Sequence, residues 1–227
     1  MANPDRLFVW AGGGLFVASL AFCAYSYFIR WSAGGAGGGW PATVVDTTLL
    51  SAFALHHSLF ARDRVKRWLV RHVPDSLMRS VYVWTASLLL IVTCVFWQPI
   101  GGDLYQAQGV RAALHVIVQL LGVWLIARSV ATIDPLDLAG IQPRQQAERL
   151  QIVGPYRLVR HPLYFGWVLV VFGASHMTRD RLAFAVLTTL YLAIAIRWEE
   201  RSLTAAFGED YERYQQQVRW KLVPYLY

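Results

Sequence analysis

The chain has 227 residues, of which 56% are hydrophobic and only 15% are Asp, Glu, Lys or Arg. This composition argues against an ordinary soluble domain, in which about a quarter of the residues are charged. The net charge of +7 would favour nucleic-acid binding in a soluble chain. Here, however, the basic residues lie in the gaps between long apolar blocks, as they do in membrane proteins. Nucleic acid is therefore excluded as a partner.

Six apolar segments are each about as long as the ~20-residue run that a membrane helix needs. They cover residues 7–29, 42–61, 80–97, 112–133, 163–178 and 182–196. The first is longer than the roughly 7–15 apolar residues of a signal peptide, so we expect it to persist as an anchor. The last two, with 16 and 15 residues, are short, and we expect flanking helix or tilting to complete them.

These segments predict an all-α fold, a multi-pass transmembrane helical bundle of about six spans that ends in a C-terminal helical hairpin. We expect a single membrane domain over residues 1–227, with a four-span N-terminal bundle (1–133) and a C-terminal region (134–227). Residues 62–79 interleave basic and apolar residues at helical spacing, which predicts an amphipathic helix at the cytoplasmic interface. Cys23 and Cys94 lack metal-ligand spacing, so we expect no metal site.

Loop charge predicts the orientation of the bundle. If the N-terminus is inside, 17 Lys and Arg lie on the cytoplasmic side and four lie outside. Because Lys and Arg of short loops stay preferentially in the cytoplasm, this arrangement is favoured, and both termini are then cytoplasmic. Arginine outnumbers lysine 19 to 2, which is compatible with a GC-rich bacterial gene. A bacterial inner membrane is therefore the expected location.

Polar side chains within the predicted spans require an explanation, because an ionisable group costs roughly 2.5–3.5 kcal/mol at mid-helix. We expect Asp46 near the outer surface and His56 and His57 to form hydrogen bonds inside the bundle, rather than a catalytic site. The alternative is a haem- or quinone-binding electron-transfer protein whose ligands include His115 and His176. The predicted topology argues against it, because the two histidine pairs lie at opposite depths.

The most informative region begins with Gly154-Pro155-Tyr156-Arg157 and continues through Arg160 and His161 to Pro162. Proline suits the first position of a helix, so the fifth span is predicted to start at Pro162. The amides that follow form an anion site at the positive end of the helix dipole. Arg157 and Arg160 precede this site, and arginine matches a carboxylate or phosphate well. We therefore expect a carboxylate-bearing ligand here.

The last two spans are predicted to form a hairpin whose tight turn centres on Asp180. Both His161 and Glu199 lie 19 residues from Asp180, so an equal rise along each arm brings them to the same depth. Residues 160–164 should then meet residues 197–200 at the cytoplasmic boundary. The alternative is that these charges simply pair with one another as the chain leaves the membrane.

A longer pattern combines Gly-Pro-Tyr-Arg-x-x-Arg-His-Pro-x-Tyr-x-Gly (154–166) with Glu199-Glu200, Phe207-Gly208 and Tyr211-x-x-Tyr214. It resembles the isoprenylcysteine carboxyl methyltransferase family over roughly the last 75 residues. This family contains multi-pass membrane enzymes that use S-adenosylmethionine. His57-Ser58-Leu59-Phe60-Ala61-Arg62, with Lys66-Arg67-Trp68 and Arg79-Ser80-x-Tyr82, is similar to its bacterial thiol S-methyltransferase-like branch.

The resemblance implies roles for particular residues. The catalytic candidates are Glu200 and Arg157, which is assigned to the acceptor side because it lies one helical turn before Arg160. His161 could instead be purely structural, and the helix that contains Tyr211 and Tyr214 is either a lid or clamp over the site or a surface helix. The residues implied in binding S-adenosylmethionine are Tyr156, Arg160, His161, Pro162, Leu163, Tyr164, Glu199 and Glu200.

The resemblance also implies a membrane methyltransferase whose acceptor enters from the bilayer and is methylated at the cytoplasmic face. A small or lipophilic thiol is the first expected acceptor, an isoprenylcysteine-like carboxylate the second and a phospholipid amine the third. S-Adenosylmethionine suits the residues present, because its carboxylate, ribose diol, adenine and sulfonium match cationic, acidic and aromatic side chains.

Overall fold

The computed structural model describes residues 3–60, 63–133, 135–141, 150 and 152–227. The chain divides into two compact units. Unit 1 comprises Met1–Gly102, Pro135–Arg144 and Thr178–Asp180. Unit 2 comprises Asp103–Asp134, Gln145–Met177 and Arg181–Tyr227. The boundary predicted at residue 133 differs from this division, because residues 103–134 belong to unit 2.

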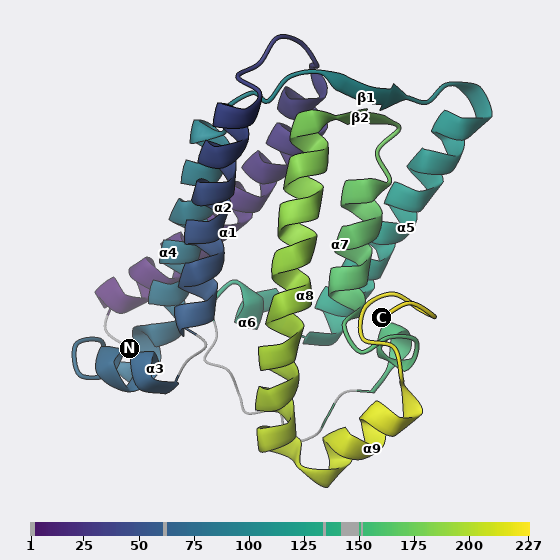
Figure 1. Ribbon diagram of the computed structural model, residues 1–227. Helices are drawn as coiled ribbons and strands as arrows, with labels where there is room; N and C mark the ends of the chain where they lie inside the picture. The colour runs from purple at the N-terminus through teal and green to yellow at the C-terminus, as the bar shows by residue number, and fades with distance from the viewer. Residues whose placement is uncertain (1–2, 61–62, 134, 142–149, 151) are drawn as a thin grey trace. The chain divides into compact units, whose positions relative to one another are not determined.

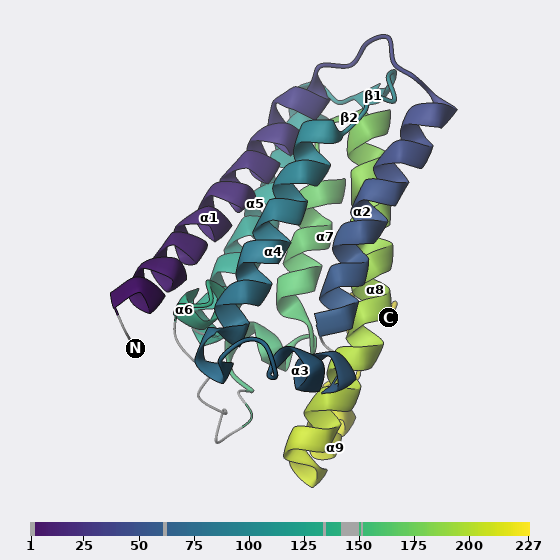
Figure 2. The same cartoon turned by 90° about the vertical axis from the view of Figure 1, so that its left-hand side faces the viewer.

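Unit 1 is helical. Its central helix, α4, lies between α1 and α2 (Figure 2). Trp84 of α4 stacks on Phe8 of α1 at 5.5 Å between ring centroids, and its indole N–H donates to the Phe8 carbonyl at 3.0 Å. The elements are α1 (Asn3–Phe28), a 3₁₀ turn η1 (Arg30–Ser32), α2 (Trp40–Phe60), α3 (Asp63–Leu69), α4 (Asp75–Phe96) and α6 (Pro135–Leu138).

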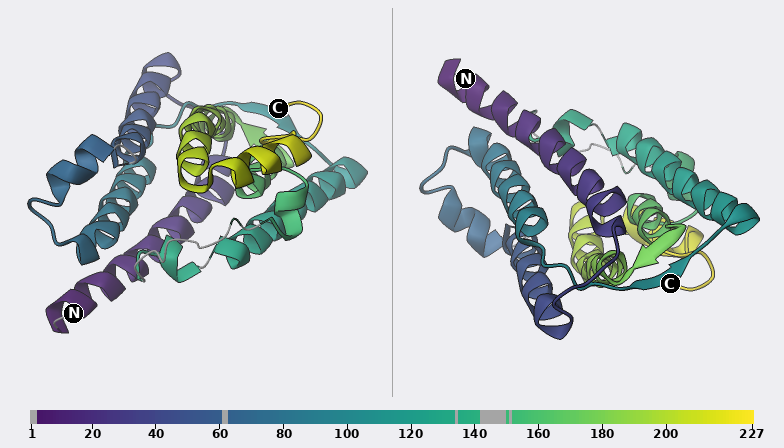
Figure 3. Two further views of the ribbon diagram at one scale, coloured as in Figure 1. Left: turned by 90° about the horizontal axis from the view of Figure 1, so that it is seen from below. Right: turned by 90° about the horizontal axis from the view of Figure 1, so that it is seen from above.

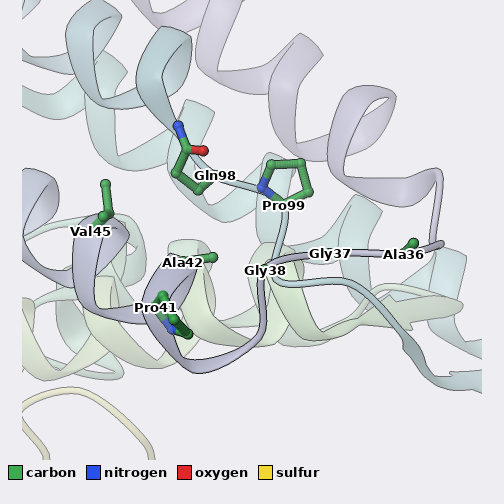
Figure 4. Close-up of a pocket in the computed structure, with 8 residues that line it drawn as sticks. All are labelled: Ala36, Gly37, Gly38, Pro41, Ala42, Val45, Gln98 and Pro99. Carbon is green, nitrogen blue, oxygen red and sulfur yellow. The ribbon is translucent and has the colours of Figure 1, made fainter.

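Two buried acids hold the chain that follows α4. Asp46 accepts a hydrogen bond from the Gln98 amide at 2.8 Å. Asp180 accepts hydrogen bonds from the Trp97 indole at 2.9 Å and from the Ile100 amide at 3.0 Å. Asp46 thus has a structural contact, and its predicted position near the outer surface stays a prediction. Next to this loop lies a pocket of about 400 Å³ with no titratable lining residue, formed by residues 36–38, 41–42, 45 and 98–99 (Figure 4).

Unit 2 is built around α7, which lies between α5 and α8 (Figure 1). At the contact of α5 with α7, Gly122 faces Gly166. A Cβ atom on Gly122 would lie 2.6 Å from the Gly166 carbonyl oxygen, so only glycine allows this approach. The elements are β1 (Asp103–Gln106), α5 (Gly109–Ile133), a 3₁₀ turn η2 (Gly154–Arg157), α7 (Pro162–Phe172), β2 (His176–Thr178), α8 (Arg179–Phe207) and α9 (Glu209–Gln217).

Four helical segments in the described part of the chain are long and apolar enough to cross a membrane. They are Asp5–Ser32, Ser76–Phe96, Gly109–Ile133 and Arg179–Phe207. The protein is therefore a multi-pass membrane protein, as predicted. Helix α2 has 21 residues, but Asp46, His56 and His57 interrupt its apolar sequence. Four of the six predicted spans are thus confirmed.

The fifth predicted span, 163–178, is wrong in extent. Helix α7 has only 11 residues, about 16 Å at 1.5 Å per residue, which is too short for a hydrocarbon core of about 30 Å. It ends at Gly173, and β2 then pairs with β1 in a two-stranded sheet. The all-α prediction therefore needs this small sheet as a correction.

The sixth predicted span is extended by flanking helix, as expected. Helix α8 has 29 residues, about 43 Å long, and it continues through Glu199 and Glu200. The turn predicted at Asp180 is wrong, because Asp180 lies in the first turn of α8. At its other end, α9 leaves α8 at a steep angle (Figure 3).

The predicted amphipathic helix over 62–79 is also interrupted. Residues 61–62 lie outside the described part, α3 ends at Leu69, and α4 already begins at Asp75, after Pro74. The interfacial position of α3 stays a prediction.

Candidate functional site

The candidate site lies within unit 2, where α7 begins. Pro162 is the first residue of α7, as predicted, and His161 is its N-cap residue. The first amides of a helix have no intrahelical acceptor, so the start of α7 directs N–H donors toward groups outside the helix. Proline at this position removes one such donor and presets the backbone angle of the first turn.

Arg160 is committed to partners within the protein. Its Nε donates to Glu200 Oε1 at 2.6 Å, and its Nη1 donates to the carbonyl oxygens of Val218 and Arg219 at 2.7 and 3.0 Å. Arg160 and Glu200 are each only 8% exposed. A buried ion pair is stable when further hydrogen bonds satisfy its donors, as they do here. Its geometry therefore makes Arg160 a structural anchor.

The segment after α9 completes this arrangement. The amides of Arg160 and His161 donate to the carbonyl oxygens of Trp220 and Lys221, both at 2.9 Å. The Lys221 ammonium lies 4.0 Å from Glu200 Oε2. The C-terminal segment thus runs beside the start of α7 (Figure 1). Sequence reasoning missed it, because backbone-to-backbone pairing leaves no residue-specific signal.

The two glutamates have different environments. The Glu199 side chain is 44% exposed, and that of Glu200 is 11% exposed. Tyr164 donates its hydroxyl hydrogen bond to Glu199 Oε2 at 2.9 Å. The His161 ring lies between the acids, with Nδ1 3.6 Å from Glu199 and Nε2 3.4 Å from Glu200. It also stacks on Tyr164 at 5.6 Å. Glu199 is therefore oriented by its neighbours yet open to a ligand.

Three tyrosines support the cluster from α9 and η2. Tyr214 donates to the Tyr156 carbonyl oxygen at 2.7 Å, and Tyr211 is 1% exposed beside Tyr214 and Val218. Burial, together with the nearby Glu199, raises the pKa of Tyr156 to about 12. Burial likewise raises the pKa of Tyr211 and of Tyr214. The tyrosines are thus neutral at physiological pH, and α9 is packed against the site rather than free at the surface.

The structure brings together most, but not all, of the predicted residues. Arg160, His161, Tyr164, Glu199 and Glu200 are joined by the contacts above, so residues 160–164 and 197–200 do meet. Tyr156 is connected to Tyr214, whose hydroxyl donates to the Tyr156 carbonyl oxygen. Arg157 is exposed at the end of η2, and in the described residues no hydrogen bond or ion pair joins it to this cluster. Its acceptor-side role stays a prediction.

The histidines proposed as haem ligands have other contacts. His115 Nδ1 lies 3.2 Å from the Gly173 carbonyl oxygen, and His176 Nε2 lies 2.8 Å from Asp103 Oδ1. His56 stacks on Tyr82 at 5.4 Å between ring centroids. The side chain of His57 lies outside the described part. Within the described residues, no group of three or more His, Cys, Asp or Glu is arranged to hold a metal ion.

Comparisons with known proteins identify related chains. A family model described as phospholipid methyltransferase matches residues 110–210. The chain is 38% identical to methanethiol S-methyltransferase 2 of Bradyrhizobium diazoefficiens over 82% of this chain and 74% of that protein. It is 36% identical to methanethiol S-methyltransferase of Mycobacterium tuberculosis over 78% and 76% of the two chains.

The chain belongs to this family of membrane methyltransferases. Nurim of Xenopus laevis is also similar, with 30% identity over 82% of this chain and 76% of that protein. No solved structure matches. Membership of the family confirms the predicted class of enzyme and the methyl donor, S-adenosylmethionine.

The residues at the start of α7 fit this donor. The half-exposed carboxylate of Glu199 suits the donor's ribose diol, since a carboxylate accepts two hydroxyl hydrogen bonds. The amides of the first turn of α7 suit an anionic group, and the Tyr164 ring offers an aromatic surface. Acidic, aromatic and amide groups thus converge within a few residues of Pro162.

Proposed function

We propose that this protein methylates a small thiol at the cytoplasmic face of a bacterial inner membrane, with methanethiol as the first candidate. The observation that carries the proposal is the half-exposed Glu199, held by Tyr164 and His161. It lies in a chain 38% identical to a methanethiol S-methyltransferase. The aligned region includes 82% of the chain, so the likeness extends well beyond the cluster itself.

The chain's own residues have separate tasks in this proposal. Glu199 binds the ribose diol, and Tyr164 orients its carboxylate. Glu200 and Arg160 position the start of α7 against α8, which changes the catalytic role predicted for Glu200 to a positioning role. His161, Pro162 and Leu163 form the wall beside them, and Arg157 is kept as the acceptor-side candidate.

S-Adenosylmethionine, when bound, supplies a methyl group activated by its sulfonium. Transfer to a thiolate is an in-line displacement, so the protein contributes mainly by holding and orienting the reactants. A thiol that has given its proton to solvent could accept the methyl group there, and S-adenosylhomocysteine would be the leaving group. The ordered side chains around Glu199 serve this positioning.

The dimensions of α8 support a cytoplasmic site. Asp180 and Glu199 are 19 residues apart on one continuous helix, about 29 Å at 1.5 Å per residue. This matches a hydrocarbon core of about 30 Å. If Arg179 lies at the outer surface, Glu199 lies at the inner one, in agreement with the charge bias of the loops. Leu190, Ile194 and Trp198 are exposed on α8, which suits entry of an apolar acceptor from the lipid.

An acceptor panel tests the function. Purified protein in lipid nanodiscs is incubated with methyl-labelled S-adenosylmethionine and, separately, with methanethiol, an isoprenylcysteine analogue or phosphatidylethanolamine. We expect labelled dimethyl sulfide from the first reaction and no labelled product from the others. At a donor concentration that limits the wild type, Glu199→Gln protein should give less labelled product. Label in the carboxylate or amine product alone would replace the thiol assignment, and label in none would refute it.

A further inference from the structure

Lys221 has the positive charge that a carboxylate-binding group in the site requires. The methyl donor carries an α-carboxylate, which requires a cation or amide donors in a partly dehydrated site. Arg160 was the sequence-based candidate, but its Nε and Nη1 already serve Glu200 and two backbone carbonyls. A second cation near the start of α7 would supply this charge.

Lys221 lies at the required place. Its carbonyl oxygen accepts the His161 amide hydrogen bond at 2.9 Å, so its backbone is fixed directly beside the N-terminus of α7. The side chain is 31% exposed, which leaves it accessible to a ligand. The first turn of α7 and Lys221 thus lie side by side on two different segments.

The contacts of Lys221 leave its ammonium with donor capacity. Its Nζ lies 4.0 Å from Glu200 Oε2, whereas a charge-assisted hydrogen bond is about 2.7–2.9 Å long. Its other contact within the described part of the chain is the Tyr227 ring, with Nζ 4.9 Å from the centroid. An ammonium has three donors. Glu200, meanwhile, has its charge balanced by Arg160 at 2.6 Å, so Lys221 is not required for that purpose.

Other nearby cations are less suitable. Arg157 and Arg219 are exposed, and no side-chain contact in the described residues connects either of them to the two glutamates. Arg201 lies over the exposed Trp198 ring at 5.0 Å. Arg213 pairs with Asp210 on α9 at 2.5 Å. Among the described residues, Lys221 is the partly exposed cation that contacts the cluster.

We propose that Lys221 binds the carboxylate of the methyl donor. This role rests on the assignment of S-adenosylmethionine as donor, and it is independent of which acceptor is methylated. Arg160 then has a positioning role, because it holds the segment that carries Lys221 against the start of α7. The site therefore extends beyond the region matched by the family model, which ends at residue 210.

A pair of ligands isolates this contact. Isothermal titration calorimetry measures binding of S-adenosylhomocysteine and of its decarboxylated analogue to wild-type protein and to Lys221→Gln. We expect the variant to bind S-adenosylhomocysteine about 10-fold to 100-fold more weakly, since a charged hydrogen bond is lost. Binding of the decarboxylated analogue should change less than about 2-fold. Lys221→Arg should restore most of the affinity, and Arg219→Ala, which removes a neighbouring exposed charge, should match wild type.

Each outcome decides the proposal. An equal loss for both ligands would make Lys221 purely structural, and unchanged affinity for both would place the carboxylate elsewhere. Failure of the wild type to bind S-adenosylhomocysteine would overturn the proposal together with the donor assignment. Normal ligand binding without thiol methylation would refute only the proposed acceptor. Thermal unfolding of every variant shows whether a loss of affinity reflects loss of folded protein.

Discussion

Each unit of the protein buries acidic residues, but the two sets differ in their partners. In unit 1, Asp46 and Asp180 accept hydrogen bonds from the backbone and the indole of one loop, residues 97–101. In unit 2, Glu200 pairs with Arg160, while Glu199 is 44% exposed and held only at its side by Tyr164 and His161. Each set contains a buried carboxylate, Asp180 or Glu200, whose contacts are with other groups of the protein.

Asp180 and Glu199 differ in how many further hydrogen bonds their carboxylates can accept. A carboxylate has about four lone-pair sites, and three of those of Asp180 are used by Trp97, Ile100 and Gly101. Glu199 is reached by one hydroxyl donor at hydrogen-bond distance and keeps capacity toward the outside. Burial of an acid therefore marks structure in both units, and the partly exposed acid beside it marks the site.

The largest effect is expected for Arg160→Ala. This variant leaves Glu200 buried without its main partner and removes the hydrogen bonds to Val218 and Arg219. Breaking a buried ion pair by removing one partner costs about 3–5 kcal/mol. The free energy of unfolding in detergent should fall by that amount, with loss of donor binding as a consequence. Arg157→Ala is the matched control and should retain wild-type stability. A stable Arg160→Ala protein would contradict the anchoring role.

Asp180→Ala should have the next largest effect, on stability alone. It leaves the Trp97 indole and the Ile100 amide without their acceptor in a buried site. Each unsatisfied buried donor costs roughly 1–3 kcal/mol. We expect a lower melting temperature, while the folded fraction, measured below that temperature, binds S-adenosylhomocysteine as wild type does. Weaker ligand binding at unchanged melting temperature would mean that the acids of unit 1 also serve the site.

Residue patterns predicted much of this arrangement. Proline placed the start of α7 at Pro162, and counting residues from Asp180 predicted that His161 and Glu199 would meet. The predicted meeting was correct although the turn itself was wrong. Residues 173–178, which include the strand β2, still connect the end of α7 to the start of α8.

Other features left no readable signal. The apolar run 163–178 does not show that its helix ends at Gly173, since periodicity cannot separate a buried strand from a buried helix. The contact of Gly122 with Gly166 depends on the mutual rotation of α5 and α7. The partners of Arg160 and Lys221 include backbone carbonyls, which any residue supplies. The charge pattern thus identified the cluster. It did not show that Arg160 is engaged by groups of the protein, while Lys221 keeps donor capacity for a ligand.

Glu199→Gln should have a smaller energetic effect than either variant above, and a different kind of effect. The amide keeps one oxygen for Tyr164 but loses the charge and part of the acceptor capacity offered to a diol. We expect binding of S-adenosylhomocysteine to weaken about 10-fold, equivalent to roughly 1.4 kcal/mol, with unchanged thermal stability. Glu200→Gln is the informative comparison, because its main effect should be a lower free energy of unfolding. Identical behaviour of the two variants would remove the distinction between the glutamates.

Asp46→Asn should have the smallest effect. Asparagine keeps the Oδ1 acceptor for the Gln98 amide, and Oδ2 of Asp46 has no hydrogen-bond partner among the described residues. Removing the charge relieves the cost of burying it, which offsets the weaker hydrogen bond. The free energy of unfolding should therefore change by less than about 1 kcal/mol, with methyl transfer unaltered. A loss of several kcal/mol would show that the Asp46 charge itself stabilises unit 1. In that case Asp46 would need a charged partner, as Glu200 has in Arg160.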